Sequence, residues 1–335
     1  MSVQVLVNVD DRSDVGEARR AAAELTRTLS FDATVAGNVA LAVTEAVTNI
    51  VKHVGHGRLV LRSLESNGIG GVEVLALDRG AGIANLGTSL RDGHSTAGSM
   101  GTGLGALSRL GGELQIYSQD GHGTALRLEF WASSRPRRSE RLEIGAICLP
   151  KAGEVVSGDA WAVEQDGGKP TLLVADGLGH GADAARAARA ATEVLARHSK
   201  EPPGVMLELG HQALAATRGA AVAVARIDLG AGQGTYAGVG NISGRIETPT
   251  GRRQLVSHNG TLGHALRKVQ EFPFDYPPNG VLIVHSDGLS SHWTLADYPG
   301  LMAQHAALIA GVLYRDHDRG RDDVTVVVIK RGTGG

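Results

Sequence analysis

The sequence predicts an α+β protein built from two domains. Its 335 residues exceed what one hydrophobic core usually supports. Residues 1–131 alternate between short β patterns and helical patterns, which predicts one sheet covered on one face by helices. Residues 141–331 place a helical pair between two groups of strands, which predicts two sheets flanked by helices. Residues 132–140 lose this periodicity and contain Pro136, so we expect a linker there.

The first domain is predicted from apolar spacing and from capping and turn residues. Asp32 can cap a helix over 33–53, whose Val43, Ala46 and Ile50 lie on one apolar stripe. Asn67-Gly68 is typical of a tight hairpin turn. The expected elements, in order, are strand 2–9, helices 14–29 and 33–53, strands 57–65 and 71–78, helix 104–110, and strands 113–119 and 123–130.

The second domain is predicted from apolar strands separated by two alanine-rich helices. Cys148 lies in one of these strands, where it is either buried filler or a reactive thiol, and as the single cysteine it permits no internal disulfide. The expected elements are strands 141–149, 154–164 and 170–176, helices 180–198 and 203–217, strands 220–228, 234–239, 243–248, 252–257 and 281–286, a helix near 300–315, and strand 324–330.

Charge and hydropathy exclude several classes of protein. The formal net charge is −2, and the one basic run, Arg135–Arg138, falls in the expected linker, so nothing favours nucleic acid or an anionic membrane surface. No apolar stretch is expected to reach the roughly 18–20 residues of a membrane helix. The first eight residues alternate like a strand and lack the features of a signal peptide. The sequence therefore predicts a cytoplasmic protein.

Three motifs in residues 45–105 predict an ATP site. Glu45 and Asn49 are four residues apart and share one face of the predicted helix 33–53. The Asn49 carbonyl can bind Mg²⁺, and Glu45 can accept a proton from an attacking hydroxyl. On its own the pair is a common helix surface, and its meaning comes from the order of all three motifs.

The other two motifs follow strand 71–78. Asp78 can accept a hydrogen bond from the adenine amine, and Gly80 and Gly82 allow the base to approach the backbone. A glycine-rich stretch then opens a helix whose backbone N–H groups can hold phosphate. Its residues are Gly101, Thr102, Gly103, Leu104 and Gly105. Lys52 and His53 either contact phosphate or form a solvated helix end.

The ordered set Glu45–Gly105 resembles the GHKL ATPase superfamily, and the compact segment 90–105 is similar to that of stressosome switch kinases of the RsbT type. The resemblance covers nearly all of residues 1–131. It implies a Bergerat α/β sandwich that phosphorylates Ser or Thr on STAS-domain proteins, using ATP with Mg²⁺. It also implies that Glu45 is the base, Asn49 the Mg²⁺ ligand and Asp78 the adenine reader.

Acidic residues at four strand ends predict a second site, for phosphoester hydrolysis by two metal ions. Asp176-Gly177 and Asp287-Gly288 each follow a buried strand, while Asp159 and the pair Asp322-Asp323 lie at the boundaries of two others. One Asp-Gly after a strand is usually only a turn, but four such corners are difficult to assign to turns alone. Oxygen ligands favour Mg²⁺ or Mn²⁺.

The run Val174–Ala185 resembles metal-dependent phosphatases of the SpoIIE type, and RsbX-like stressosome phosphatases in particular. The resemblance spans about 141–331 and implies a four-layer αββα sandwich. It implies that Asp176 bridges both metals with the Gly177 carbonyl as a further ligand, that Asp159 serves one metal, and that Asp287 and either Asp322 or Asp323 serve the other. His180 either protonates the leaving alkoxide or has a structural role.

The two resemblances together predict a bifunctional regulator of a partner-switching or stressosome pathway. Its kinase half would phosphorylate a STAS-domain anti-sigma antagonist or stressosome protein, and its phosphatase half would remove that phosphate. The alternative is a phosphatase whose N-terminal half is a nucleotide-gated partner-binding module without kinase activity. Binding ATP and using it require mostly the same residues, so both hypotheses remain.

Overall fold

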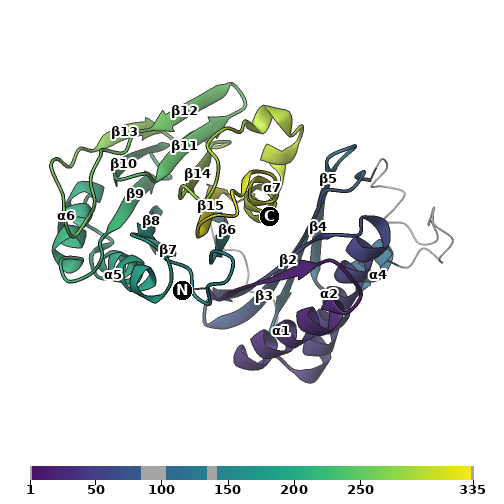
Figure 1. Cartoon of the computed structure of the whole chain (residues 1–335). Helices are drawn as coiled ribbons and strands as arrows, with labels where there is room; N and C mark the ends of the chain where they lie inside the picture. Colours follow the sequence, from purple (N-terminus) through teal and green to yellow (C-terminus); the bar gives the residue numbers. More distant parts are fainter. Residues whose placement is uncertain (1, 84–102, 134–141, 333–335) are drawn as a thin grey trace. The chain divides into compact units, whose positions relative to one another are not determined.

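The computed structural model describes residues 2–83, 103–133 and 142–332 (Figure 1). Its contacts form two compact units, each described here by itself. The N-terminal unit contains the described residues up to 133 together with Tyr298–Arg315. The C-terminal unit contains the described residues from 142 to Asp297 and those from Asp316 onward. The segment Tyr298–Arg315 therefore packs with the first unit although the sequence places it inside the second.

The N-terminal unit is a five-stranded antiparallel sheet with helices against one face (Figure 1). The strand order is β1-β2-β3-β5-β4. Alternate residues such as Leu59, Leu61 and Val74 face α2, whose Val43 and Val47 are fully buried. The elements are β1 (Gln4–Val9), α1 (Asp14–Thr28), α2 (Ala33–His53), β2 (Gly57–Ser66), β3 (Ile69–Asp78), α4 (Gly103–Arg109), β4 (Glu113–Gln119) and β5 (Gly123–Trp131).

Helix α2 begins where the sequence predicts, because Asp32 caps it. The Asp32 carboxylate accepts hydrogen bonds from the N–H groups of Thr34 and Val35, at 2.8 and 2.9 Å. We expect Asp32→Ala to lower the free energy of unfolding of this unit by about 1 kcal/mol, the usual cost of losing such a cap. Urea denaturation measures the change. Asp32→Asn is the control, because asparagine also caps and should lose much less; equal losses in both variants would contradict a capping role.

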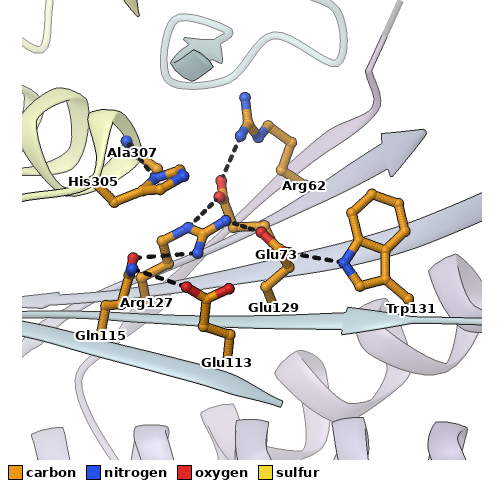
Figure 2. A network of polar contacts seen from close by, with 9 residues as sticks. All are labelled: Arg62, Glu73, Glu113, Gln115, Arg127, Glu129, Trp131, His305 and Ala307. Carbon is orange, nitrogen blue, oxygen red and sulfur yellow. Dashed lines mark hydrogen bonds and ion pairs between the residues drawn. The ribbon is translucent and has the colours of Figure 1, made fainter. Parts of the chain in front are cut away.

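A buried ion-pair network lies on the other face of the same sheet (Figure 2). Glu73 and Glu129 are directly opposite each other on β3 and β5. Arg127 pairs with both carboxylates, through Nε to Glu73 at 2.7 Å, and Arg62 pairs with Glu73 at 2.8 Å. Trp131 donates its indole N–H to Glu129 at 2.7 Å. Two like charges can face each other here because arginine neutralises them.

The C-terminal unit contains two five-stranded sheets that face each other. Their orders are β13-β10-β9-β8-β7 and β12-β11-β14-β15-β6. Apolar residues of both sheets, among them Val174, Tyr236 and Val327, form the core between them. Helices α5 and α6 cover the outer face of the first sheet with a second core that includes Leu195 and Leu207.

The elements of this unit follow the predicted order. They are β6 (Leu142–Leu149), β7 (Asp159–Asp166), β8 (Lys169–Gly177), α5 (Ala182–His198), α6 (Pro203–Ala213), β9 (Ala220–Asp228), β10 (Gln233–Val239), β11 (Ser243–Thr248), β12 (Gly251–Leu255), β13 (Phe272–Asp275), β14 (Val281–His285), η1 (Leu295–Asp297) and β15 (Val324–Arg331). The short helix η2 (Leu301–Ala303) and α7 (Ala306–His317) lie between η1 and β15 in the chain.

Several details differ from the sequence expectations. Strand β13 was not expected, because Pro273 lies inside it; proline is tolerated because β13 is an edge strand that pairs only with β10. Strand β7 begins at Asp159 rather than at 154. Helix α2 does meet the length and composition of a membrane span, contrary to expectation. Its buried face belongs to the core of the N-terminal unit, as in many soluble proteins.

Candidate functional site

The end of helix α2 is packed onto the end of strand β3, and this contact gathers the first set of predicted residues. Ile50 lies against the backbone of Gly57, which pairs with Asp78 in the sheet. Val54 lies against Gly80, where an added Cβ would approach its Cγ2 to 2.5 Å. Glu45 and Asn49 are half-buried on α2, and they lie about two turns and about one turn, respectively, before Val54.

The Asp78 carboxylate is held by the turn that follows β3. Its Oδ1 accepts hydrogen bonds from the N–H groups of Gly80 and Thr124, at 2.9 and 3.2 Å. Gly82 has φ of +79°, and a Cβ there would lie 2.3 Å from the carbonyl oxygen of Gln119, so only glycine fits. The hairpin β4–β5 therefore fixes Asp78 through Oδ1, which leaves Oδ2 as the oxygen suited to an exocyclic amine.

The glycine-rich stretch falls partly outside the described residues. Gly101 and Thr102 lie outside them, and helix α4 begins at Gly103. Leu104 packs against the core of the N-terminal unit, and Gly105 is buried. Lys52 and His53 are both exposed at the end of α2.

The predicted acidic residues gather at the edges of the two C-terminal sheets. Asp159 and Asp176 are direct partners on neighbouring strands β7 and β8 of one sheet. Asp287 follows β14, and Asp322-Asp323 precede β15, its neighbour in the other sheet. A hydrogen bond of 2.6 Å from Ser286 Oγ to Asp159 Oδ2 joins the two edges. The structure thus brings together carboxylates that are up to 164 residues apart in the chain.

The electrostatics of this cluster are those of an uncompensated group of acids. Burial, followed by the charge of Asp159 and of the other aspartates, raises the pKa of Asp176 to about 9. Burial also raises the pKa of Asp159 to about 7, although hydrogen bonds from Ser286 and Thr325 act in the opposite direction. Each carboxylate would release its proton more readily beside a cation.

Asp322 and Asp323 have different environments. Asp323 is 3% exposed and accepts a hydrogen bond of 2.9 Å from the Lys151 N–H through Oδ1. Its Oδ2 is buried and has no hydrogen-bond partner among the described residues. Asp322 is exposed, and its Oδ1 accepts the N–H of Asp323. Asp323 is therefore anchored inside the unit, while Asp322 faces outward from the same turn.

Three supporting residues were not predicted from the sequence. Ser286 holds Asp159, and Asn241 donates to Asp287 Oδ2 at 2.7 Å. Glu154 contacts His180, with 2.6 Å between Oε1 and Nδ1. Ser286 directly precedes Asp287, so the Ser-Asp-Gly run was the available signal; Asn241 and Glu154 had none, because only folding brings them near. Cys148 is half-buried, and burial of its thiol raises the pKa to about 12, which favours the role of filler over that of a reactive thiol.

The donor set fits hard divalent cations such as Mg²⁺ or Mn²⁺. It consists of carboxylates and the backbone carbonyl of Gly177. Only glycine fits at position 177, because an added Cβ would lie 2.2 Å from the carbonyl oxygen of Ala184. No group of three or more His, Cys, Asp or Glu side chains within residues 2–83, 103–133 and 142–332 is placed to hold a metal by itself. Mg²⁺ commonly keeps several waters, which agrees with few direct protein ligands.

The raised pKa values predict that the metal-free C-terminal unit is destabilised as pH rises. The folded values of Asp159 and Asp176 exceed the unfolded value of 3.8, so the folded state binds more protons and stability falls as pH rises toward about 9. Between pH 6 and 9 with chelator, we expect a loss on the order of 5 kcal/mol, or roughly 10–20 °C in Tm.

Calorimetry with and without Mn²⁺ measures this effect. We expect saturating Mn²⁺ to remove most of the pH dependence, because the cation binds the ionised carboxylates. A Tm of this unit that rises with pH in chelator would contradict the raised pKa values.

Comparison with known proteins identifies the class of each half. Residues 9–130 match the family described as histidine kinase-like ATPase domain. Residues 166–332 match the family described as stage II sporulation protein E (SpoIIE). The chain thus joins a GHKL-like ATPase domain to a SpoIIE domain of the PP2C class of serine/threonine phosphatases. The predicted α+β fold class, with these two domain types, is confirmed.

Individual relatives match each half separately. Serine/threonine-protein kinase RsbT of Bacillus subtilis (strain 168) is 28% identical over 131 residues, which are 39% of this chain and 98% of RsbT. Phosphoserine phosphatase RsbX of the same organism is 27% identical over 153 residues, 45% of this chain and 77% of RsbX. A solved structure from work on the bacterial stressosome as a modular system is 31% identical, covers 57% of this chain and 100% of its own, and has a TM-score of 0.53. The predicted combination of an RsbT-like and an RsbX-like half is confirmed.

Proposed function

We propose that this protein both adds and removes a phosphate on a serine or threonine of a STAS-domain regulator in a partner-switching pathway, in the cytoplasm. The observation that carries the proposal is that one chain holds both arrangements. Asp78 lies beside the end of the helix bearing Glu45 and Asn49, and a separate cluster of buried aspartates spans two sheet edges. The similarity to a kinase and to a phosphoserine phosphatase supports the two opposite directions.

In the phosphatase half, the chain's own residues would position the reactants. Asp159 and Asp176 come from adjacent strands, and Ser286 orients Asp159 through its hydrogen bond. Asp287, oriented by Asn241, and the exposed Asp322 would complete the ligand set, with Asp323 holding the turn from inside. Two Mg²⁺ or Mn²⁺ ions, with the Gly177 carbonyl as one ligand, would supply Lewis acidity and an activated water.

In the kinase half, Asp78 would bind the adenine amine and Asn49 the Mg²⁺ that accompanies ATP. Glu45 would accept the proton from the substrate hydroxyl during transfer of the γ-phosphate. The helix that begins at Gly103 follows the residues expected to hold the phosphates.

In the phosphatase half, His180 is held by Glu154 and is half-exposed next to the aspartates. It is available to donate a proton to the leaving group.

A time course of labelling tests the proposal as a whole. Purified protein, γ-labelled ATP and a purified STAS-domain substrate should give label on the substrate, and addition of unlabelled ATP with Mn²⁺ should then remove it. Removal that stops with a Mn²⁺ chelator supports the phosphatase half. Label that never appears, even when hydrolysis is blocked, would reduce the N-terminal half to a nucleotide-gated partner-binding module. That second candidate is favoured by one observation: Arg315 of α7 donates a hydrogen bond to the carbonyl oxygen of Asp78, so a nucleotide bound there lies beside a residue of the helix that precedes β15.

A further inference from the structure

The second face of the N-terminal sheet is buried, although α1, α2 and α4 all cover the first face (Figure 1). Val60, Leu75 and Leu77 alternate with the core residues of β2 and β3, so they point to the second face, and each is at most 1% exposed. The network around Arg127 lies on the same face (Figure 2). An antiparallel sheet that is buried on both faces requires a cover on each.

Helix α7 contributes to the second cover. Gly311 lies close enough to this face that an added Cβ would be 3.1 Å from Leu77 Cδ2. The Arg58 guanidinium lies over the ring of Tyr314, 4.7 Å from its centroid. Both contacts come from the last two turns of the helix, and Arg58 is the direct partner of Leu77 across β2 and β3. The end of α7 is therefore seated at the end of β3.

Arg315 extends this contact to the turn that begins with Asp78. Its Nη1 donates to the carbonyl oxygen of Asp78 at 3.0 Å, and the Arg79 guanidinium donates in return to the carbonyl oxygen of Arg315. Arg315 is 4% exposed, so its own side chain is largely shielded from water, whereas the Arg79 side chain is exposed. The side chain of Asp78 is thus the predicted adenine contact, while the backbone carbonyl of the same residue accepts a hydrogen bond from α7.

The chain beyond Arg315 leads directly to the phosphatase aspartates. Two residues on, the His317 carbonyl accepts the Ser290 N–H at 2.9 Å, and the Arg319 N–H donates to the Gly288 carbonyl at 2.9 Å. These bonds tie residues 317–319 to the loop that contains Asp287. Asp322 and Asp323 follow within four residues of Arg319. Only the short stretch 315–317 separates the contact at Asp78 from the contact at the Asp287 loop.

We propose that the Arg79–Arg315 contact makes the phosphatase respond to nucleotide: occupancy of the Asp78 site changes metal binding and turnover at Asp287 and Asp322. The inference rests on the proposed function of both halves. A ligand that alters the Asp78–Arg79 turn must alter the hydrogen bonds that hold Arg315, and Arg315 is covalently joined to the metal-site loop. Coupling of this kind between two sites typically changes affinity by 5- to 150-fold.

The experiment measures hydrolysis of p-nitrophenyl phosphate by the full chain, with and without saturating ADP, at a buffered free Mn²⁺ concentration near half-saturation. ADP removes phosphoryl transfer from the measurement, and the small substrate removes partner binding. We expect ADP to change the wild-type rate at least fivefold. Arg79→Ala and Arg315→Ala should bring the ratio of the two rates to within twofold of one. Arg19→Ala, which removes an exposed arginine on α1, should keep the wild-type ratio.

Calorimetric titration gives the ADP affinity of each variant, so that every ratio is taken at saturation. Arg315→Ala leaves the side chains of the nucleotide turn intact and provides the test if Arg79→Ala weakens ADP binding. The inference is overturned if the rates of the wild-type protein with and without ADP differ by less than twofold. It is also overturned if Arg79→Ala and Arg315→Ala both keep the response to ADP that the wild-type protein shows. Absence of hydrolysis with Mn²⁺, or of ADP binding, instead overturns the proposed function and the inference with it.

Discussion

Asp176→Asn is expected to lower phosphatase turnover by about 10³-fold or more. Asp176 is the aspartate whose pKa is most strongly raised by burial and by the other acids, so it is the carboxylate that most needs a cation beside it. Asparagine keeps the shape but loses the charge, and loss of metal-supplied transition-state stabilisation of about 4 kcal/mol corresponds to this factor. Hydrolysis of a phosphoserine peptide at saturating Mn²⁺ measures the change.

The same substitution should stabilise the metal-free protein, because asparagine is neutral without binding a proton, whereas burial and the other aspartates force Asp176 to hold one. Loss of activity with an unchanged or higher Tm in chelator therefore separates a functional role from a folding defect. Asp228→Asn is the matched control, since Asp228 ends a neighbouring strand, is half-exposed and pairs with Lys169 at 3.0 Å. Turnover of Asp176→Asn within tenfold of wild type would remove Asp176 from the proposed centre.

Glu45→Gln is expected to lower phosphoryl transfer to a STAS-domain substrate by about 10²- to 10⁴-fold, the usual range for a general base. ADP affinity should stay within a few-fold, because glutamine keeps the size of the half-buried side chain and Asp78 is untouched. The assay is made in the Asp176→Asn background, where the product is not hydrolysed. Glu17→Gln, an exposed residue on α1, is the control.

Asp78→Asn should give the opposite pattern. It removes a charged acceptor, so nucleotide affinity should fall roughly 10- to 100-fold, in line with 1.5–3 kcal/mol for such a hydrogen bond. Transfer at saturating ATP should change much less. If Glu45→Gln transfers phosphate at the wild-type rate, the base is another residue. If no variant and no wild-type sample transfers phosphate, the binding-module alternative takes the place of the kinase.

The local parts of the fold were accessible from sequence because their signals are local. The cap at Asp32, the apolar stripe of α2 and the glycine-bounded hairpins each depend on neighbours within a few residues. The strand features that the sequence did not predict depend on partners far away in the chain. Strand β13 contains Pro273 and exists only because β10 lies beside it. Strand β7 begins at Asp159 because its pairing with β8 ends at the pair Asp159 and Asp176.

The candidate sites divide in the same way. The sequence by itself determined which residues carry the chemistry, because strand-end aspartates and the order of Glu45, Asn49 and Asp78 are readable along the chain. Only the tertiary structure decided that Asp323 is anchored inside while Asp322 faces outward, and that Ser286, Asn241 and Glu154 support their neighbours. It also placed Tyr298–Arg315 with the N-terminal sheet. The physical reason is that burial and hydrogen bonding between residues far apart in the chain are properties of the packed molecule, which no local pattern encodes.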